Sequence, residues 1–149
     1  MILWRLLRFL LPITGAVGWA YFIFWISVDP SPAGAEIAED GGFLAWLPRA
    51  DLFAHFGVYA ILAFFLRWSL GWVHAWRPFD WAIKNGMPII VAGLYGVGLE
   101  LQQENIDARA GEALDVVADT LGAIVMVWVL AYVLPRVSRR TQTMVDRLG

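Results

Sequence analysis

The chain has 149 residues and no cysteine. Without cysteine it can have no disulfide, no haem–thiolate bond and no thiolate-bound iron–sulfur cluster. Charged residues make up only 16% of the chain and hydrophobic residues 60%, which excludes an ordinary soluble domain. A net charge of −2 gives no indication of binding to nucleic acid. The composition therefore favours a membrane protein.

Four apolar segments approach the length that a membrane span requires. About 20 apolar residues cross a hydrocarbon core of ~30 Å, and backbone groups in lipid must hydrogen-bond internally, so each segment is predicted to be a helix. The first segment is nearer 20 residues than the ~7–15 of a signal peptide, so we expect it to remain as a helix. The sequence thus predicts an all-α integral membrane protein in which residues 1–149 form a single four-helix bundle. The expected spans are approximately 9–28, 52–70, 82–103 and 113–134.

The distribution of basic residues predicts the orientation of the bundle. The chain has 11 Lys and Arg residues. Nine of them flank the side of the spans that carries both termini, and only Arg49 and Arg109 lie in the two loops on the other side. Because basic residues are enriched in cytoplasmic segments, we expect both termini in the cytoplasm, an N-in/C-in arrangement.

Polar residues interrupt the apolar spans near the ends that this orientation places outside. Within each helix they recur about one turn apart, so they form stripes on single helix faces. An intramembrane charge costs ~2.5–3.5 kcal/mol on insertion scales unless it is paired or hydrated, so the stripes should turn inward and meet. The residues are Asp51, His55, Tyr59, Glu100, Gln103, Arg109, Asp115 and Asp119.

We expect four of these residues to form one contact cluster with catalytic potential. The imidazole of His55 is the candidate general acid or base, because its ordinary pKa lies near neutrality. The carboxylates of Glu100, Asp115 and Asp119 are candidates to orient it, to share a proton or to hold a divalent cation. The candidate ligand-binding residues are Asp51, Tyr59, Gln103 and Arg109, and Arg109 is expected to pair with Glu100 or Asp115. Each residue also has a structural interpretation; Asp51, for example, could only cap its helix.

Three segments together resemble the VanZ-like family, small bacterial membrane proteins named for a member associated with teicoplanin resistance. They read Asp51-x-x-x-His55-Phe56-x-x-Tyr59, then Glu100-x-x-Gln103 followed by Arg109, and Asp115-Val116-x-Ala118-x-Thr120-x-Gly122. The resemblance covers about residues 51–123. Two positions depart from the family pattern, which often has Lys at position 52 and usually has Asn at position 119, whereas this chain has Leu and Asp. The resemblance implies a cell-envelope role in the bacterial cytoplasmic (inner) membrane, related to antibiotic resistance.

Several functions remain open at this point. The first is an envelope protein whose site, on the extracytoplasmic side, binds or modifies a lipid, a lipid-linked precursor or a glycopeptide-type antibiotic. The second is a metal-assisted membrane hydrolase or phosphotransferase, with a divalent cation as its cofactor. The others are a small proton-coupled transporter, which would need to be a dimer, and a structural or assembly subunit whose polar network only fixes helix packing. Whether any reaction is catalysed stays open.

Overall fold

The described part of the chain consists of long helices that follow one another along the sequence. A computed structural model describes residues 2–28, 50–70, 80–103 and 113–136. These residues form α1 (Ile2–Val28), α3 (Ala50–Leu70), α4 (Asp80–Gln103) and α5 (Ala113–Trp128), and α5 continues into the short π-helical segment η3 (Val129–Val133).

Four helical segments are long and apolar enough to cross a membrane, by length and composition. They are Leu10–Val28, Asp51–Leu70, Asp80–Gln103 and Ala113–Arg136. The prediction of an all-α protein with four membrane-spanning helices is therefore confirmed, and the chain has the architecture of an integral membrane protein. Helices are what a bilayer requires here, because every backbone polar group in a helix interior finds its partner within the same segment.

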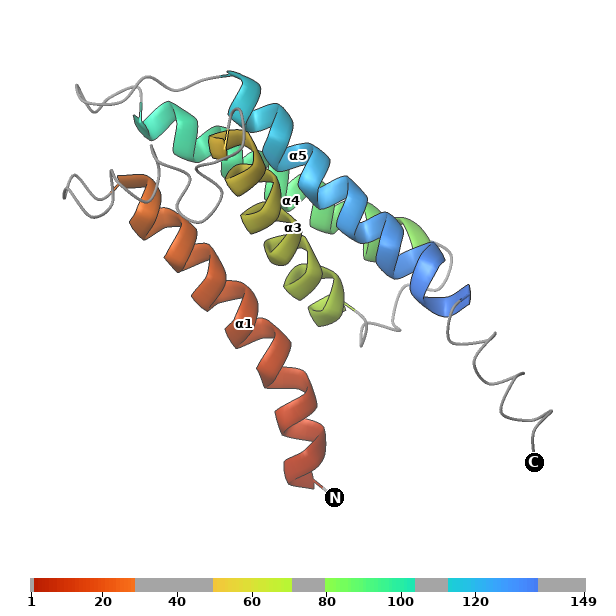
Figure 1. Ribbon diagram of the computed structural model, residues 1–149. Coiled ribbons are helices and arrows are strands. Elements are labelled where there is room, and N and C mark those ends of the chain that lie inside the picture. The colour runs from red at the N-terminus through yellow and green to blue at the C-terminus, as the bar shows by residue number, and fades with distance from the viewer. Residues whose placement is uncertain (1, 29–49, 71–79, 104–112, 137–149) are drawn as a thin grey trace.

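The arrangement of the helices brings distant parts of the chain to the same end of the bundle. Helix α5 packs mainly against α3 and α4, and α1 packs mainly against α3. Figure 1 shows that α3 and α5 start at the end of the bundle where α1 and α4 finish. Residues early in α3 and α5 can therefore meet residues late in α4.

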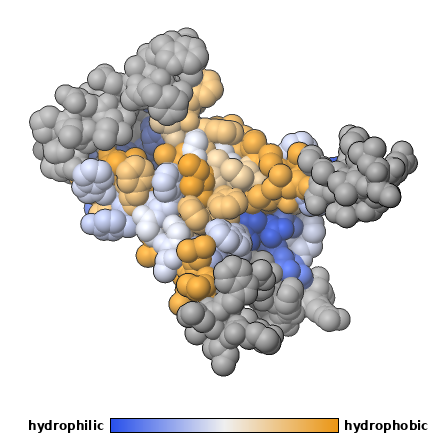
Figure 2. All heavy atoms as spheres, turned by 60° about the horizontal axis from the view of Figure 1, so that its bottom comes forward, coloured by the Kyte–Doolittle hydropathy of each residue, from blue (hydrophilic) through white to orange (hydrophobic). Residues whose placement is uncertain are grey.

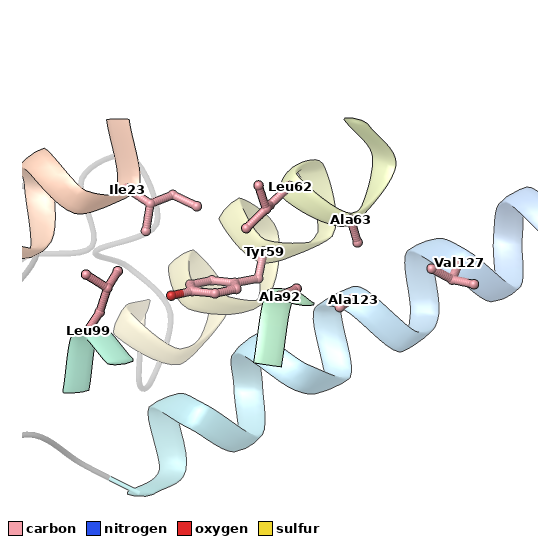
Figure 3. Close-up of a cluster of buried hydrophobic side chains, with 8 residues drawn as sticks. All are labelled: Ile23, Tyr59, Leu62, Ala63, Ala92, Leu99, Ala123 and Val127. Atoms are coloured by element: carbon pink, nitrogen blue, oxygen red, sulfur yellow. The ribbon is translucent and has the colours of Figure 1, made fainter. Parts of the chain in front are cut away.

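A compact apolar core lies below that end and draws on all four helices. Figure 3 shows the Tyr59 ring projecting from α3 among labelled side chains of the other three helices. The buried residues of the core are Ile23, Tyr59, Leu62, Ala63, Ala92, Leu99, Ala123 and Val127. Many other large apolar side chains, among them Leu94 and Val17, stay exposed, and Figure 2 shows hydrophobic side chains over much of the described surface. Such a surface suits acyl chains as the surrounding solvent.

Glycine permits two close approaches in this core. A Cβ atom on Gly122 of α5 would overlap the backbone carbonyl oxygen of Phe56 in α3, so only glycine allows these two helices to lie so close. A Cβ atom on Gly96 of α4 would lie 2.6 Å from Asp119 Oδ2. Gly98, two residues further along α4, makes no such approach, because a Cβ atom there would meet nothing within 4 Å.

Three side chains attach α1 to the other helices through backbone carbonyl groups. The Trp19 indole of α1 donates to the carbonyl oxygen of Val58 at 2.7 Å. From α4, the Tyr95 hydroxyl donates to Ala20 at 2.6 Å and the Gln103 amide to Ser27 at 3.1 Å. The Val58 and Ala20 carbonyl groups lie inside helices, so they accept these donors with a second lone pair, whereas the Ser27 carbonyl lies in the last turn of α1, where no intrahelical donor follows. The attachments hold α1 to the bundle without any charged group.

Candidate functional site

A histidine and three carboxylates gather where α3 and α5 begin and α4 ends. His55 lies in the second turn of α3, and Glu100 lies in the last turn of α4. Asp115 lies in the first turn of α5 and Asp119 one turn later. Their positions follow from the helix period, which sets residues four apart on one face, and from the antiparallel packing of α4 and α5 (Figure 1). We call these four residues the His–carboxylate cluster.

The shortest contact of the cluster joins α3 to α5. His55 Nδ1 lies 2.9 Å from Asp119 Oδ1, and Asp119 is only 1% exposed. A carboxylate accepts, so we assign the hydrogen to Nδ1, which donates to Oδ1. An ionised carboxylate can persist at such depth only with strong hydrogen-bond partners. Asp119 thereby fixes both the orientation of the imidazole and its tautomer, and leaves Nε2 with a free lone pair when the ring is neutral.

The second ring nitrogen faces the other carboxylates. His55 Nε2 lies 3.7 Å from Asp115 Oδ2, which is too long for a hydrogen bond. One ligand-type atom from each of His55, Glu100 and Asp115 lies within 4.8 Å of the other two. Glu100 is buried, whereas the side chains of Asp115 and His55 are 15% and 27% exposed. One imidazole and two carboxylates thus lie close together, and two of the three side chains are partly exposed.

Tyr59 and Gly96 shape the inner wall of the site. The Tyr59 hydroxyl interacts with the Asp119 carboxyl group, and its ring packs in the apolar core (Figure 3). Gly96 contributes by lacking a side chain, because a Cβ atom there would displace Asp119 Oδ2. The sequence predicted Tyr59 as a site residue, whereas Gly96 was not among the predicted site residues. The signal for Gly96 was its position one helix turn before Glu100 on the same face.

The remaining predicted site residues lie apart from the cluster or outside the described ranges. Gln103 is buried, and its amide donates to Ser27 of α1. Asp51 lies in the first turn of α3 and is partly buried; among the described residues it forms no hydrogen bond or ion pair with the cluster. Arg109 lies outside the described residues, so its expected pairing with Glu100 or Asp115 stays a prediction.

A separate polar contact occupies the opposite end of the bundle. Arg67 Nε donates to Asn85 Oδ1 at 3.1 Å, and the Asn85 amide group donates in turn to the Trp81 carbonyl oxygen at 2.8 Å. Lys84 pairs with Asp80 at 2.7 Å, one turn apart on α4. Sequence analysis did not single out Asn85, a single amide within a polar helix start. These contacts satisfy polar groups locally, and they provide a reference region at the other end of the same helices from the His–carboxylate cluster.

The cluster has the parts needed for proton transfer or for binding a cation. A carboxylate-oriented imidazole is the usual arrangement for a general base and for a metal ligand alike. The two further carboxylates can accept hydrogen bonds from a ligand or bind a metal ion directly. Comparison of the chain with protein-family models, curated proteins and solved structures finds no match.

Proposed function

We propose that this protein is a VanZ-like cell-envelope protein of the bacterial cytoplasmic membrane that binds or modifies an amphiphilic ligand at the His–carboxylate cluster. The ligand is a lipid, a lipid-linked envelope precursor or a glycopeptide-type antibiotic with an acyl chain. The observation that carries this proposal is the hydrogen bond of His55 to Asp119, a carboxylate that is almost fully buried within a membrane-spanning helix. Ionisable groups inside a membrane are expensive and in general serve a function.

The position of the cluster supports an amphiphile as the ligand. The four residues lie within about two turns of the helix ends, at the depth where a head group meets the hydrocarbon region. His55 stays partly accessible there. The flanking helices expose apolar side chains such as Leu101 and Leu114, against which an acyl chain can pack. A ligand with a polar head and an apolar tail matches both surfaces.

The orientation expected from the basic residues indicates on which side of the membrane the site lies. If both termini are cytoplasmic, the end of the bundle at which α3 and α5 begin faces the extracytoplasmic side. Envelope precursors and glycopeptide antibiotics meet on that side of the membrane. The proposal places the site in the outer leaflet, where His55 acts as the proton-transferring group or as a ligand-binding group.

A direct binding measurement tests the proposal. The full chain in lipid nanodiscs is titrated separately with teicoplanin, undecaprenyl phosphate and phosphatidylglycerol, and binding is followed by native mass spectrometry. We expect one of these probes to bind, and His55→Ala to weaken that binding at least about tenfold, the loss of one well-placed polar contact of about 1.4 kcal/mol. Asp80→Asn at the opposite end is the matched control and should bind like the wild type. Binding that is unchanged in His55→Ala would contradict the proposal.

A structural role for the cluster is the main alternative, because the same hydrogen bond joins α3 to α5. In that case the His55 and Asp119 variants lose stability but affect no ligand. Measuring stability and probe binding on the same variants separates the two. A bundle that stays folded in His55→Ala while it loses probe binding favours the ligand-binding function.

A further inference from the structure

His55, Glu100 and Asp115 each bring one potential metal-ligand atom within 4.8 Å of the others. We infer that His55, Glu100 and Asp115 form a binding site for one divalent transition-metal ion, such as Zn²⁺ or Mn²⁺, with Asp119 as the residue that orients the histidine. This inference deepens the proposed function and rests on the same site, since the ion would be the group that contacts the ligand's head.

The two ring nitrogens of His55 have different neighbours. Nδ1 is engaged by Asp119 at 2.9 Å, and Nε2 faces Asp115 at a distance too long for a hydrogen bond. Histidines that bind metals in general donate their other N–H to a carboxylate or carbonyl group, which sets the tautomer and raises the basicity of the ligating nitrogen. Asp119 is the carboxylate that accepts from the other ring nitrogen, which explains why an acid is placed so deep in α5.

The three ligand atoms are spaced closely enough to share one ion. They lie within 4.8 Å of one another, and the pair Nε2 and Asp115 Oδ2 is separated by 3.7 Å. Two ligands bonded to one tetrahedral ion at about 2.0–2.2 Å are about 3.4 Å apart. The pair is therefore close to bonding separation, and small side-chain rotations bring the third ligand in. Carboxylates held so close repel each other, and a cation between them relieves that repulsion.

The types of the three ligands decide which metal ion fits the site. A mixed set of one imidazole and two carboxylates suits Zn²⁺, Mn²⁺ or Fe²⁺ better than Mg²⁺ or Ca²⁺, which prefer oxygen ligands alone. Three protein ligands leave further coordination positions open for water or for a ligand. An ion held there offers a phosphate or carboxylate head group a positive partner at a site otherwise lined by carboxylates.

The test uses the metal alone as the probe. The full chain in nanodiscs is stripped with a chelator and titrated with Zn²⁺ by calorimetry and with Mn²⁺ by electron paramagnetic resonance. We expect about one ion per chain, and we expect Glu100→Gln, Asp115→Asn and His55→Ala each to remove stoichiometric binding. Binding should also weaken as the pH falls, because the histidine must be neutral to bind metal. Asp80→Asn is the control and should bind one ion.

Asp119 variants distinguish its orienting role from a direct one. Asp119→Asn keeps an oxygen that can accept from Nδ1, so we expect its metal affinity to fall about tenfold, whereas Asp119→Ala should lose up to about a hundredfold. Circular dichroism and size-exclusion chromatography confirm that each variant is folded. Failure of the wild type to bind either ion, or full binding by the Glu100→Gln/Asp115→Asn double variant, would overturn the inference.

The outcomes for the metal and for the proposed function are separable. If one ion binds and no lipid or antibiotic probe does, the metal site stands and the proposed function fails. If a probe binds equally well to the chelator-treated and the metal-loaded chain, the proposed function stands, and the assigned role of the ion as the contact to the head group is wrong.

Discussion

Asp119 Oδ1 accepts a hydrogen bond from His55 Nδ1 across the interface of α5 and α3, at 2.9 Å. The two residues are 64 positions apart in the chain, and the carboxylate is almost completely buried. The bond therefore serves two purposes at once: it ties two membrane-spanning helices together, and it aims Nε2 at Asp115 and Glu100. Substitutions at Asp119 should therefore change the stability of the bundle and the function of His55 by different amounts.

Replacing Asp119 separates these two effects. Asp119→Ala removes the acceptor and leaves the partly buried His55 donor without it, which should lower the free energy of unfolding by about 1–3 kcal/mol. Asp119→Asn retains an acceptor oxygen and should lose less. The measurement is denaturant unfolding in mixed micelles, followed by tryptophan fluorescence. Equal stability of the Ala variant and the wild type would show that the bond contributes nothing to folding.

The close approach of α3 and α5 makes Gly122 sensitive to substitution. In Gly122→Ala the new methyl group meets the Phe56 carbonyl oxygen, which is backbone and cannot move alone. We expect a loss of about 1–3 kcal/mol from overpacking. Gly98→Ala, where a Cβ atom meets nothing within 4 Å, is the control and should be neutral or slightly stabilising, because alanine favours helix. Thermal unfolding of the two variants side by side checks this, and similar midpoints would refute it.

The attachment of α1 should depend on Tyr95. Its hydroxyl donates to the Ala20 carbonyl oxygen at 2.6 Å, so Tyr95→Phe should cost about 0.5–1.5 kcal/mol, the net value of one hydrogen bond. Tyr132→Phe, on an exposed residue whose ring lies by Arg136, keeps its ring contact and should change little. Protease sensitivity of α1 in nanodiscs provides a second readout. A Tyr95→Phe variant as stable as Tyr132→Phe would show that this hydrogen bond does not stabilise the fold.

The absence of cysteine allows a clean test of orientation. Ser31→Cys and Thr143→Cys each introduce a single thiol, one between the first and second membrane-spanning helices and one after the fourth. With both termini in the cytoplasm, a membrane-impermeant maleimide added to intact cells should label only Ser31→Cys. Labelling of Thr143→Cys in intact cells, with Ser31→Cys protected, would put the His–carboxylate cluster on the cytoplasmic side. Permeabilised cells, in which both should react, are the control.

The sequence alone determined the helices and their membrane-spanning character. Runs of about 20 apolar residues have one stable form in lipid, so length and composition suffice. The helix period also placed Asp115 and Asp119 on one face. Because a charged face cannot meet acyl chains without a large cost, the gathering of His55, Glu100 and both aspartates could be predicted before any packing was known.

Only the tertiary structure decided how each helix is rotated and which atoms meet. Gln103 shares the end of α4 with Glu100, yet it turns to Ser27 of α1, and Gly98 faces open space although Gly96 abuts Asp119. The sequence could not assign Nδ1 to Asp119 and Nε2 to the side of Asp115. These choices depend on the rotation of each helix within the bundle, which is set by the fit of side chains between helices rather than by the helix period within one of them.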